Sequence, residues 1–166
     1  MKDKAIEAMP KKQPKFYKKK VGACFLIPLN DGRYAYCQYV HWHEQMGPLF
    51  KIFDLITTTP VEIESLDGKK ALFPPVFIGL GSAIKSGRWK QFGLLGIEDF
   101  SFPKFRQTFG TKPGEYHDWK LWDGKNYEAV GDLPEAARNL EILCGWSPQL
   151  LEKRIAERSH FGQKLH

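Results

Sequence analysis

The stretch VGACFLIPLNDGRYAYCQYVHW (residues 21–42) contains two apolar runs on either side of one short polar segment. That segment holds Asn30, Asp31 and Gly32, residue types that tolerate the positive φ angles of a tight turn. We therefore predict a β-hairpin with Asp31 and Gly32 as its central pair, a register that places Cys24 opposite Tyr39.

Both faces of this predicted hairpin are apolar. In the predicted register, one face carries Cys24, Leu26, Cys37 and Tyr39, and the other carries Ala23, Phe25, Ile27, Tyr36 and Val40. A strand pair that is apolar on both faces is typical of the centre of a sheet that is covered on both sides. The hairpin therefore predicts a domain built around a buried sheet.

The rest of the chain supplies further strands and then helices. Alternation and turn residues predict strands over residues 49–57, 61–64, 74–81 and 88–96, and a second hairpin over residues 118–130 around Asp123 and Gly124. The segment at residues 61–64 alternates apolar and acidic side chains, which is typical of an edge strand. Gly93 interrupts its strand and indicates a bulge or a close backbone contact.

Two short helices are predicted at the end of the chain. Asp132 and Glu135 resemble a capping box, and Gly145 suits the end of the helix that would follow. Ser147 and Pro148 form an N-cap and first-turn pair for a second helix. The predicted fold class is α+β, with a mostly antiparallel β-sheet or partly open barrel and two short C-terminal helices.

The positive charge is confined to one end of the chain. The formal net charge is +6, yet the first twenty residues hold eight lysines against Asp3 and Glu7, so residues 21–166 are neutral overall. We predict a disordered lysine-rich tail over residues 1–20 and a single β-rich domain over residues 21–166. Clustered lysines attract phosphates, so a nucleic-acid-binding module that uses this tail is an alternative function.

The chain offers little that indicates catalysis. It has no apolar run long enough for a membrane span and no secretory signal, and its three cysteines make no disulfide framework, so we expect a cytoplasmic protein with reduced thiols. His41 and His43 could ligate a metal, which leaves an enzyme as a third possibility, but no third ligand has convincing spacing. We predict no catalytic residues, no metal and no cofactor.

Charge and aromatic residues are segregated between two neighbouring segments. Residues 85–112 hold six basic against two acidic side chains, and residues 113–137 hold six acidic against two basic. The acidic segment also holds large aromatic side chains, a combination that suits a surface for a basic protein partner. The competing interpretation is that the aromatics fill the sheet and the charges pair with one another. The predicted contact residues are Tyr116, Asp118, Trp119, Trp122, Asp123 and Glu128.

Several motifs resemble a known family. The stretches IPLNDGRYAYCQYV (residues 27–40), FDL (53–55), GRWKQFG (87–93) and FPKF (102–105) are similar to those of immunity protein 26, a family of bacterial polymorphic-toxin immunity proteins. Cys37 stands where glycine is expected. The resemblance implies a mostly β cytoplasmic protein, encoded beside a toxin, that neutralises this toxin by binding and has no enzyme activity. Its partner would be a toxin domain, often a nuclease.

Overall fold

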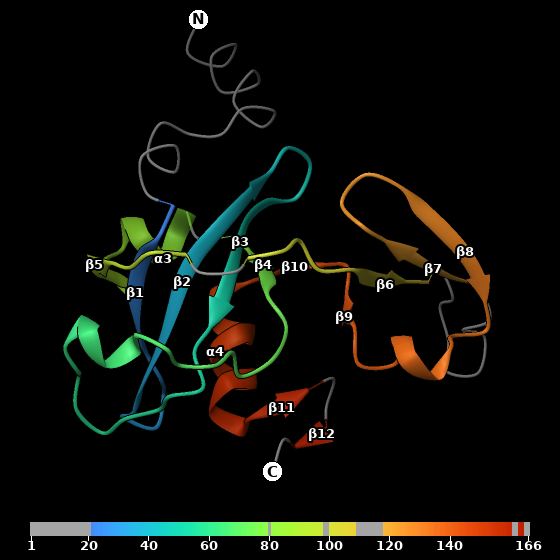
Figure 1. Ribbon diagram of the computed structural model, residues 1–166. Helices are drawn as coiled ribbons and strands as arrows, with labels where there is room; N and C mark the ends of the chain where they lie inside the picture. Colours follow the sequence, from blue (N-terminus) through green and yellow to red (C-terminus); the bar gives the residue numbers. More distant parts are fainter. Residues whose placement is uncertain (1–20, 80, 98–99, 109–117, 161–162, 165–166) are drawn as a thin grey trace, which may run out of the picture. The chain divides into compact units, whose positions relative to one another are not determined.

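The protein forms two compact units in a computed structural model that describes residues 21–79, 81–97, 100–108, 118–160 and 163–164. Unit 1 comprises Met1–Glu98 and Gly145–His166, and unit 2 comprises Asp99–Cys144 (Figure 1). Unit 2 is therefore an insertion in the sequence of unit 1. The predicted tail over residues 1–20 lies outside the described residues, and the single domain over residues 21–166 stays a prediction.

Unit 1 is built on a six-stranded sheet in the order β10-β4-β3-β2-β1-β5. Neighbouring strands are antiparallel, except that β10 runs parallel to β4. The strands are β1 (Ala23–Pro28), β2 (Tyr34–His43), β3 (Gly47–Ile52), β4 (Val76–Ile78), β5 (Lys90–Leu94) and β10 (Gly145–Trp146).

The β1–β2 hairpin forms at the predicted place, but its turn is one residue longer than predicted. The Leu29 N–H donates to the Arg33 carbonyl with an N···O distance of 2.8 Å, which encloses a three-residue loop from Asn30 to Gly32. Gly32 adopts a φ of +84°, the left-handed conformation that closes hairpin loops of this length.

The longer turn shifts the register by one residue, so the predicted assignment of side chains to the two faces of the hairpin is wrong. Cys24 lies opposite Gln38 instead of Tyr39, and Phe25 lies opposite Cys37. Because side chains alternate along a strand, Cys24 and Cys37 now belong to different core clusters on opposite faces. The central position of the hairpin is confirmed, since β1 and β2 each have two neighbours and both faces are buried.

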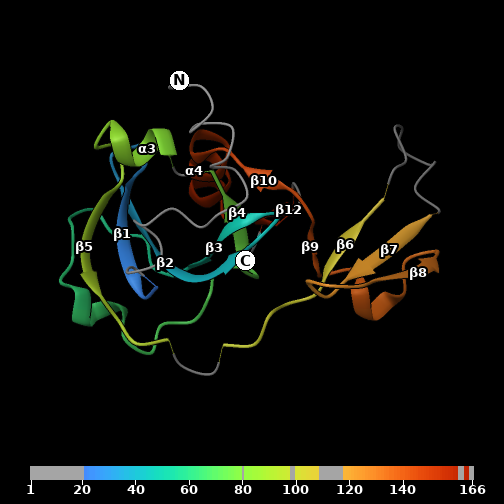
Figure 2. The same cartoon turned by 90° about the horizontal axis from the view of Figure 1, so that it is seen from above.

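One face of this sheet is covered by the helix α4 (Pro148–Glu157), which confirms the second predicted helix. The Ser147 hydroxyl caps it by accepting from the Leu150 N–H at 3.3 Å. Leu151 and Ile155 are fully buried in the larger core cluster with residues of β1 to β4. Both views of the ribbon show α4 beside β4 (Figures 1 and 2).

The opposite face is covered in part by a 3-10 helix, η2 (Ile63–Leu66), so the strand predicted over residues 61–64 is wrong. Leu66 is fully buried in the smaller core cluster. Ile63 lies against β5, where a Cβ atom added to Gly93 would clash with the Ile63 Cδ1. The close contact predicted at Gly93 is therefore confirmed, and the β1–β5 register also shifts beside it.

Unit 2 contains a four-stranded sheet in the order β8-β7-β6-β9. Strands β7 and β8 form the predicted second hairpin, and β6 pairs with β7 antiparallel and with β9 parallel. The strands are β6 (Phe105–Gln107), β7 (Trp119–Trp122), β8 (Tyr127–Gly131) and β9 (Glu141–Ile142).

The first predicted C-terminal helix is wrong. A 3-10 helix, η3 (Glu135–Ala137), occupies its first turn, and β9 replaces the rest. The backbone that would continue the helix is used by β6, since the Leu143 N–H donates to the Arg106 carbonyl at 2.9 Å. Tertiary strand pairing therefore overrides the local helical pattern.

The α+β class and the mostly antiparallel pairing are confirmed, and neither sheet is closed into a barrel within the described residues. The remaining elements are a short helix, α3 (Gly81–Lys85), and the strand pair β11 (Ser159–His160) and β12 (Gln163–Lys164). No helix in the described part of the chain is both long enough and apolar enough to cross a membrane.

Candidate partner-binding surface

The β7–β8 hairpin of unit 2 is held at its tip by a tight, well-defined turn. Gly124 has a φ of +100°, and a Cβ atom there would come within 2.8 Å of the Phe102 ring. One carboxylate oxygen of Asp123 accepts from the backbone N–H groups of Lys125 at 2.9 Å and Asn126 at 2.8 Å. These hydrogen bonds lower the pKa of Asp123, so its carboxylate is charged at neutral pH.

The strand registers align two neighbouring rows of side chains across this sheet. The first row runs Glu141, Phe105, Trp122 and Tyr127 from β9 to β8. Its first three members are buried, and the Trp122 ring centroid lies 5.9 Å from that of Phe105 and 6.2 Å from that of Tyr127. Phe105 and Trp122 of this row form the aromatic core of unit 2.

The second row is displaced by one residue and lies on the other face. It runs Ile142, Arg106, Leu121 and Glu128. Side chains directly opposite each other on neighbouring strands share a face, so these four form one continuous strip. Ile142 and Glu128 are exposed, and Arg106 and Leu121 are half-buried. We call this strip the outer row.

Arg106 has defined partners at the centre of the outer row. Its Nε donates to the Leu140 carbonyl at 2.9 Å, and its guanidinium carbon lies 5.4 Å from the centroid of the Trp119 ring. Partial burial lowers the pKa of Arg106, and the nearby Glu141 opposes that shift. The basic group of β6 is therefore held against the hairpin instead of extending into solvent.

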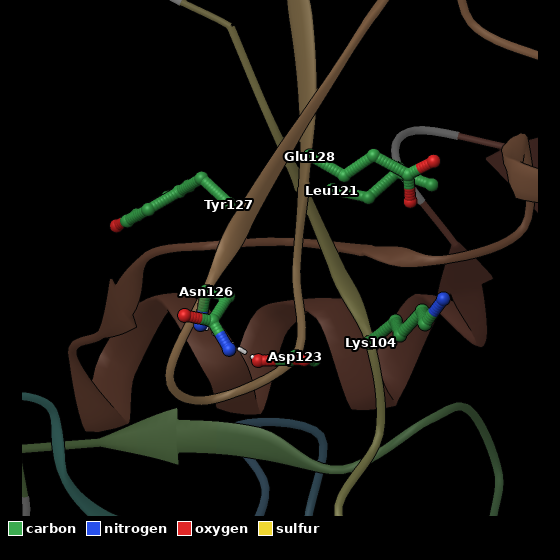
Figure 3. A pocket seen from close by; sticks show the side chains of 6 residues that line it. All are labelled: Lys104, Leu121, Asp123, Asn126, Tyr127 and Glu128. Carbon is green, nitrogen blue, oxygen red and sulfur yellow. Dashed lines mark hydrogen bonds between the residues drawn. The ribbon is translucent and has the colours of Figure 1, made fainter.

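A shallow pocket of about 70 Å³ lies at the turn end of the outer row. Figure 3 shows Leu121, Glu128 and Lys104 extending to one side of the hairpin, whereas Tyr127 extends to the other. The pocket is lined by Lys104, Leu121, Asp123, Asn126, Tyr127 and Glu128. It therefore combines an apolar wall, two carboxylates and one ammonium group.

The three acidic residues predicted as contacts are all exposed. Asp118 lies just before β7, Asp123 lies in the turn, and Glu128 lies in β8. Of these, Asp123 also has a local structural role, because its carboxylate accepts two hydrogen bonds within the turn. Asp118 and Glu128 are thus the cleaner candidates for contact with a partner.

The predicted aromatic contacts divide between surface and core. Trp119 is half-buried against Arg106, whereas Trp122 is only 2% exposed and belongs to the aromatic core, as the competing interpretation expected. Tyr116 lies outside the described residues. The sequence reasoning missed Tyr127, which is 52% exposed. Its place directly before Glu128 in the acidic and aromatic segment is the signal that could have indicated it.

Two basic residues also enter this surface, Arg106 in β6 and Lys104 directly before it, so the two charged segments meet in line with the competing interpretation. Lys104 lines the pocket and helps to lower the pKa of Asp123, and Arg106 lies in the outer row. In the sequence, both residues belong to the basic segment and lie more than ten residues before the hairpin. Strand pairing between β6 and β7 brings the two segments together.

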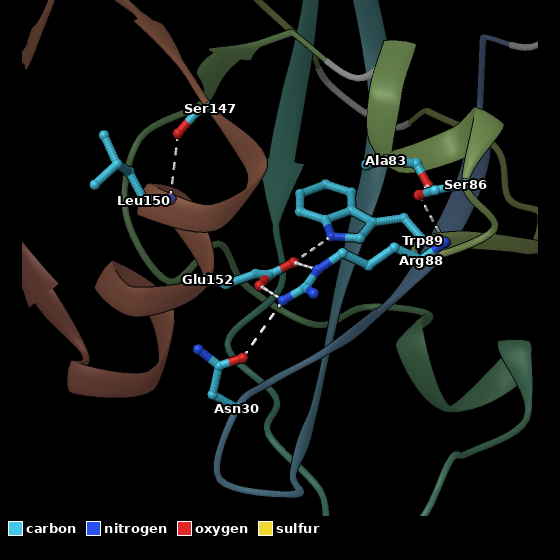
Figure 4. A network of polar contacts seen from close by, with 8 residues as sticks. All are labelled: Asn30, Ala83, Ser86, Arg88, Trp89, Ser147, Leu150 and Glu152. Atoms are coloured by element: carbon cyan, nitrogen blue, oxygen red, sulfur yellow. Dashed lines mark hydrogen bonds and ion pairs between the residues drawn. The ribbon is translucent and has the colours of Figure 1, made fainter.

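A second polar cluster, in unit 1, has a structural role. The Glu152 side chain is 2% exposed and accepts from the Arg88 guanidinium and from the Trp89 indole N–H, with a distance of 2.7 Å from Trp89 Nε1 (Figure 4). This contact joins α4 to the segment that precedes β5. Arg88 and Trp89 of the GRWKQFG motif therefore hold α4 against the sheet.

The histidines and cysteines that could have carried chemistry lie in structural surroundings. The Nδ1 of His43 accepts from the backbone N–H of Gln45 at 3.2 Å, and burial lowers the pKa of His41. Among the described residues, no group of three His, Cys, Asp or Glu side chains could hold a metal ion. Burial raises the pKa of Cys24 to about 11 and that of Cys37 well above its ordinary value.

Comparison with known protein families supports the resemblance that the sequence motifs indicated. No curated protein and no solved structure matches the chain. A family model described as immunity protein 26 matches residues 20–111, more than half of the chain. The matched residues include β1 to β6, with the hairpin and the GRW segment on which unit 1 is built. The chain therefore belongs to the immunity protein 26 family.

Proposed function

We propose that this chain is a non-catalytic immunity protein that acts in the bacterial cytoplasm and neutralises a toxin encoded beside it. It binds the toxin domain and occludes its active surface, and the β7–β8 hairpin of unit 2 provides the contact. Membership of the immunity protein 26 family supports a non-catalytic immunity role. The hairpin supplies the surface.

The observation that carries this proposal is the position of the hairpin beyond the family match. The match ends at residue 111, whereas β7 begins at Trp119 and β8 ends at Gly131. A family that binds diverse toxin domains needs a shared scaffold and a surface that differs with the partner. Unit 1 fits the scaffold, and the hairpin fits the partner-specific surface.

The exposed groups of the hairpin suit a toxin with a basic cleft. Asp118 and Glu128 are exposed carboxylates, and the half-buried Trp119, which follows Asp118 in the chain, offers an aromatic ring beside Arg106 of the outer row. Aromatic side chains anchor interfaces, and complementary charge raises the rate of association. A nuclease, whose cleft must attract phosphates, would present such a basic surface.

Co-expression with the toxin domain encoded next to this gene tests the proposal. The wild-type chain should restore growth, and Asp118→Lys with Glu128→Lys should lose protection, with an association rate about tenfold lower at low salt. These two positions leave the Asp123 turn intact. Glu62→Lys with Glu157→Lys is the matched control, because it changes the net charge equally at exposed positions of unit 1.

Two results would contradict the proposal. Failure of the wild-type chain to bind or protect against the neighbouring toxin domain would remove the immunity role. Equal protection by the hairpin variant and its control would remove the hairpin as the contact. A variant without residues 1–20 tests the alternative of nucleic-acid binding through the tail, which predicts a steep salt dependence that disappears with the tail.

A further inference from the structure

We infer that the toxin docks on the face of unit 2 that carries the outer row, and that it inserts a basic side chain into the pocket beside Glu128 and Asp123. This inference rests on the proposed function and states which face binds and what chemistry the partner presents there. An arginine is the side chain that fits this chemistry best, because its planar guanidinium pairs with carboxylates through two hydrogen bonds.

The choice of face follows from the two rows of the sheet. The row that contains Phe105 and Trp122 is already packed, since both residues are no more than 2% exposed and Phe102 lies 5.7 Å from Trp122 between ring centroids. The outer row keeps accessible apolar surface at Leu121 and at Ile142, which is 37% exposed. A partner can bury this surface without any rearrangement of the core.

The choice of a basic occupant follows from the lining of the pocket. The carboxylates of Asp123 and Glu128 outnumber the single ammonium of Lys104. Leu121 provides an apolar wall, against which the methylene stem of an arginine or lysine can pack while its charged end reaches a carboxylate. Glu128 and Lys104 extend on the same side of the hairpin, so both would lie close to the inserted group (Figure 3).

Lys104 provides a second test, because removal of its charge should change the affinity for the toxin in the opposite direction from removal of the Glu128 charge. If a cation enters the pocket, Glu128 attracts it and Lys104 repels it. Removal of the Glu128 charge should therefore weaken binding, and removal of the Lys104 charge should strengthen it. A misfolded variant cannot bind more tightly than the wild type, so the Lys104 variant separates a pocket effect from damage to the fold.

The experiment measures the Kd of the full-length protein for the catalytically silenced toxin domain encoded next to its gene, by biolayer interferometry at two salt concentrations. Glu128→Gln should raise Kd about tenfold, and Lys104→Gln should lower it about threefold, with both effects smaller at high salt. Glu157→Gln and Lys153→Gln, at exposed positions on α4, are the matched controls and should leave Kd within about twofold.

The outcomes separate this inference from the function on which it rests. Wild-type binding with no change in either pocket variant overturns the inference and leaves the immunity role standing. Tighter binding by Glu128→Gln and weaker binding by Lys104→Gln also overturns it, because that pattern indicates an acidic occupant. Absence of wild-type binding overturns the proposed function and the inference together.

Discussion

The two units of this protein use their sheets in different ways. The central strands of unit 1 are buried on both faces, by α4 on one side and partly by η2 on the other. The sheet of unit 2 has one packed row and one accessible row. A sheet covered on both faces can only support other elements, whereas a sheet with one accessible face can also bind a partner.

The charged side chains that α4 buries and those that the β7–β8 hairpin exposes differ in the same way. In unit 1, the buried Glu152 carboxylate pairs with the Arg88 guanidinium, and the guanidinium carbon of the buried Arg154 lies 3.7 Å from the centroid of the Phe73 ring. In unit 2, Asp118 and Glu128 remain exposed. The buried Glu152 of unit 1 therefore fixes the helix of that unit, whereas the exposed carboxylates of the unit 2 hairpin remain accessible to solvent.

Deletion of residues 99–144 is the strongest test of this division and has the largest expected effect. β5 and β10 lie at opposite edges of the unit 1 sheet, so the replacement must span five strand spacings of about 4.8 Å, or about 24 Å. A Gly/Ser linker of about 20 residues has a suitable mean span. We expect a folded unit 1 by circular dichroism and complete loss of protection against the toxin.

A shortened chain that does not fold would contradict the division between scaffold and binding surface. It would instead support the prediction that residues 21–166 form a single cooperative domain. A chain that folds and still protects would place the toxin contact in unit 1. Direct fusion of Glu98 to Gly145 is the control, since the four residues that remain after β5 are too few to reach from one edge of the sheet to the other.

Phe50→Ala should be the most destabilising single substitution among those considered, because it opens a cavity in the two-sided core of unit 1. Phe50 is fully buried, and its ring centroid lies 6.0 Å from that of Phe25 and 5.6 Å from that of Tyr39. We expect a loss of about 3–5 kcal/mol in the free energy of unfolding, measured with urea. Leu150→Ala, at a side chain 61% exposed, should change it by less than about 0.5 kcal/mol.

Glu152→Ala should have a smaller effect on unit 1, since it leaves Arg88 and the Trp89 indole without their acceptor. We expect a loss of about 2–3 kcal/mol in the same measurement. The effect is smaller than for Phe50 because the Arg88 side chain is 38% exposed and can be hydrated. Glu157→Ala, an exposed carboxylate on the same helix, is the control. Equal stabilities of these two variants would show that the cluster does not fix α4.

Asp123→Asn should have the smallest effect, and the difference from the wild type should be present at neutral pH and disappear in acid. The folded pKa of Asp123 lies below its ordinary value of 3.8, so its carboxylate stabilises the turn above that value, and this contribution is lost as the pH falls through the folded pKa. Asparagine keeps the acceptor oxygen but has no charge to lose.

The measurement for this variant is amide hydrogen exchange in the β7–β8 hairpin between about pH 5 and pH 2. We expect the exchange protection of the wild type, corrected for intrinsic rates, to fall toward that of the variant as the pH is lowered. Asp118→Asn controls for loss of a carboxylate elsewhere in the hairpin. A wild-type protection that stays constant relative to Asp123→Asn would contradict the role of the charged carboxylate in the turn.

The sequence predicted the elements whose signals are local. The β1–β2 hairpin, the β7–β8 hairpin and α4 with its Ser147 cap all depend on residues within a few positions of one another. The family resemblance was also local, since its motifs lie in β1 to β6. The exposed carboxylates at Asp118 and Glu128 followed from the same kind of pattern, because acidic residues on a hairpin rarely enter the core.

The tertiary structure decided what depends on distant partners. It replaced a predicted helix with η3 and β9, because β6 takes up the backbone of residues 141–143. It also placed Trp122 in the core and Arg106 beside the hairpin, since only strand pairing determines which residues share a row. Sequence patterns give the period of an element, but its register and its neighbours come from long-range packing, and these determine which face of unit 2 stays accessible.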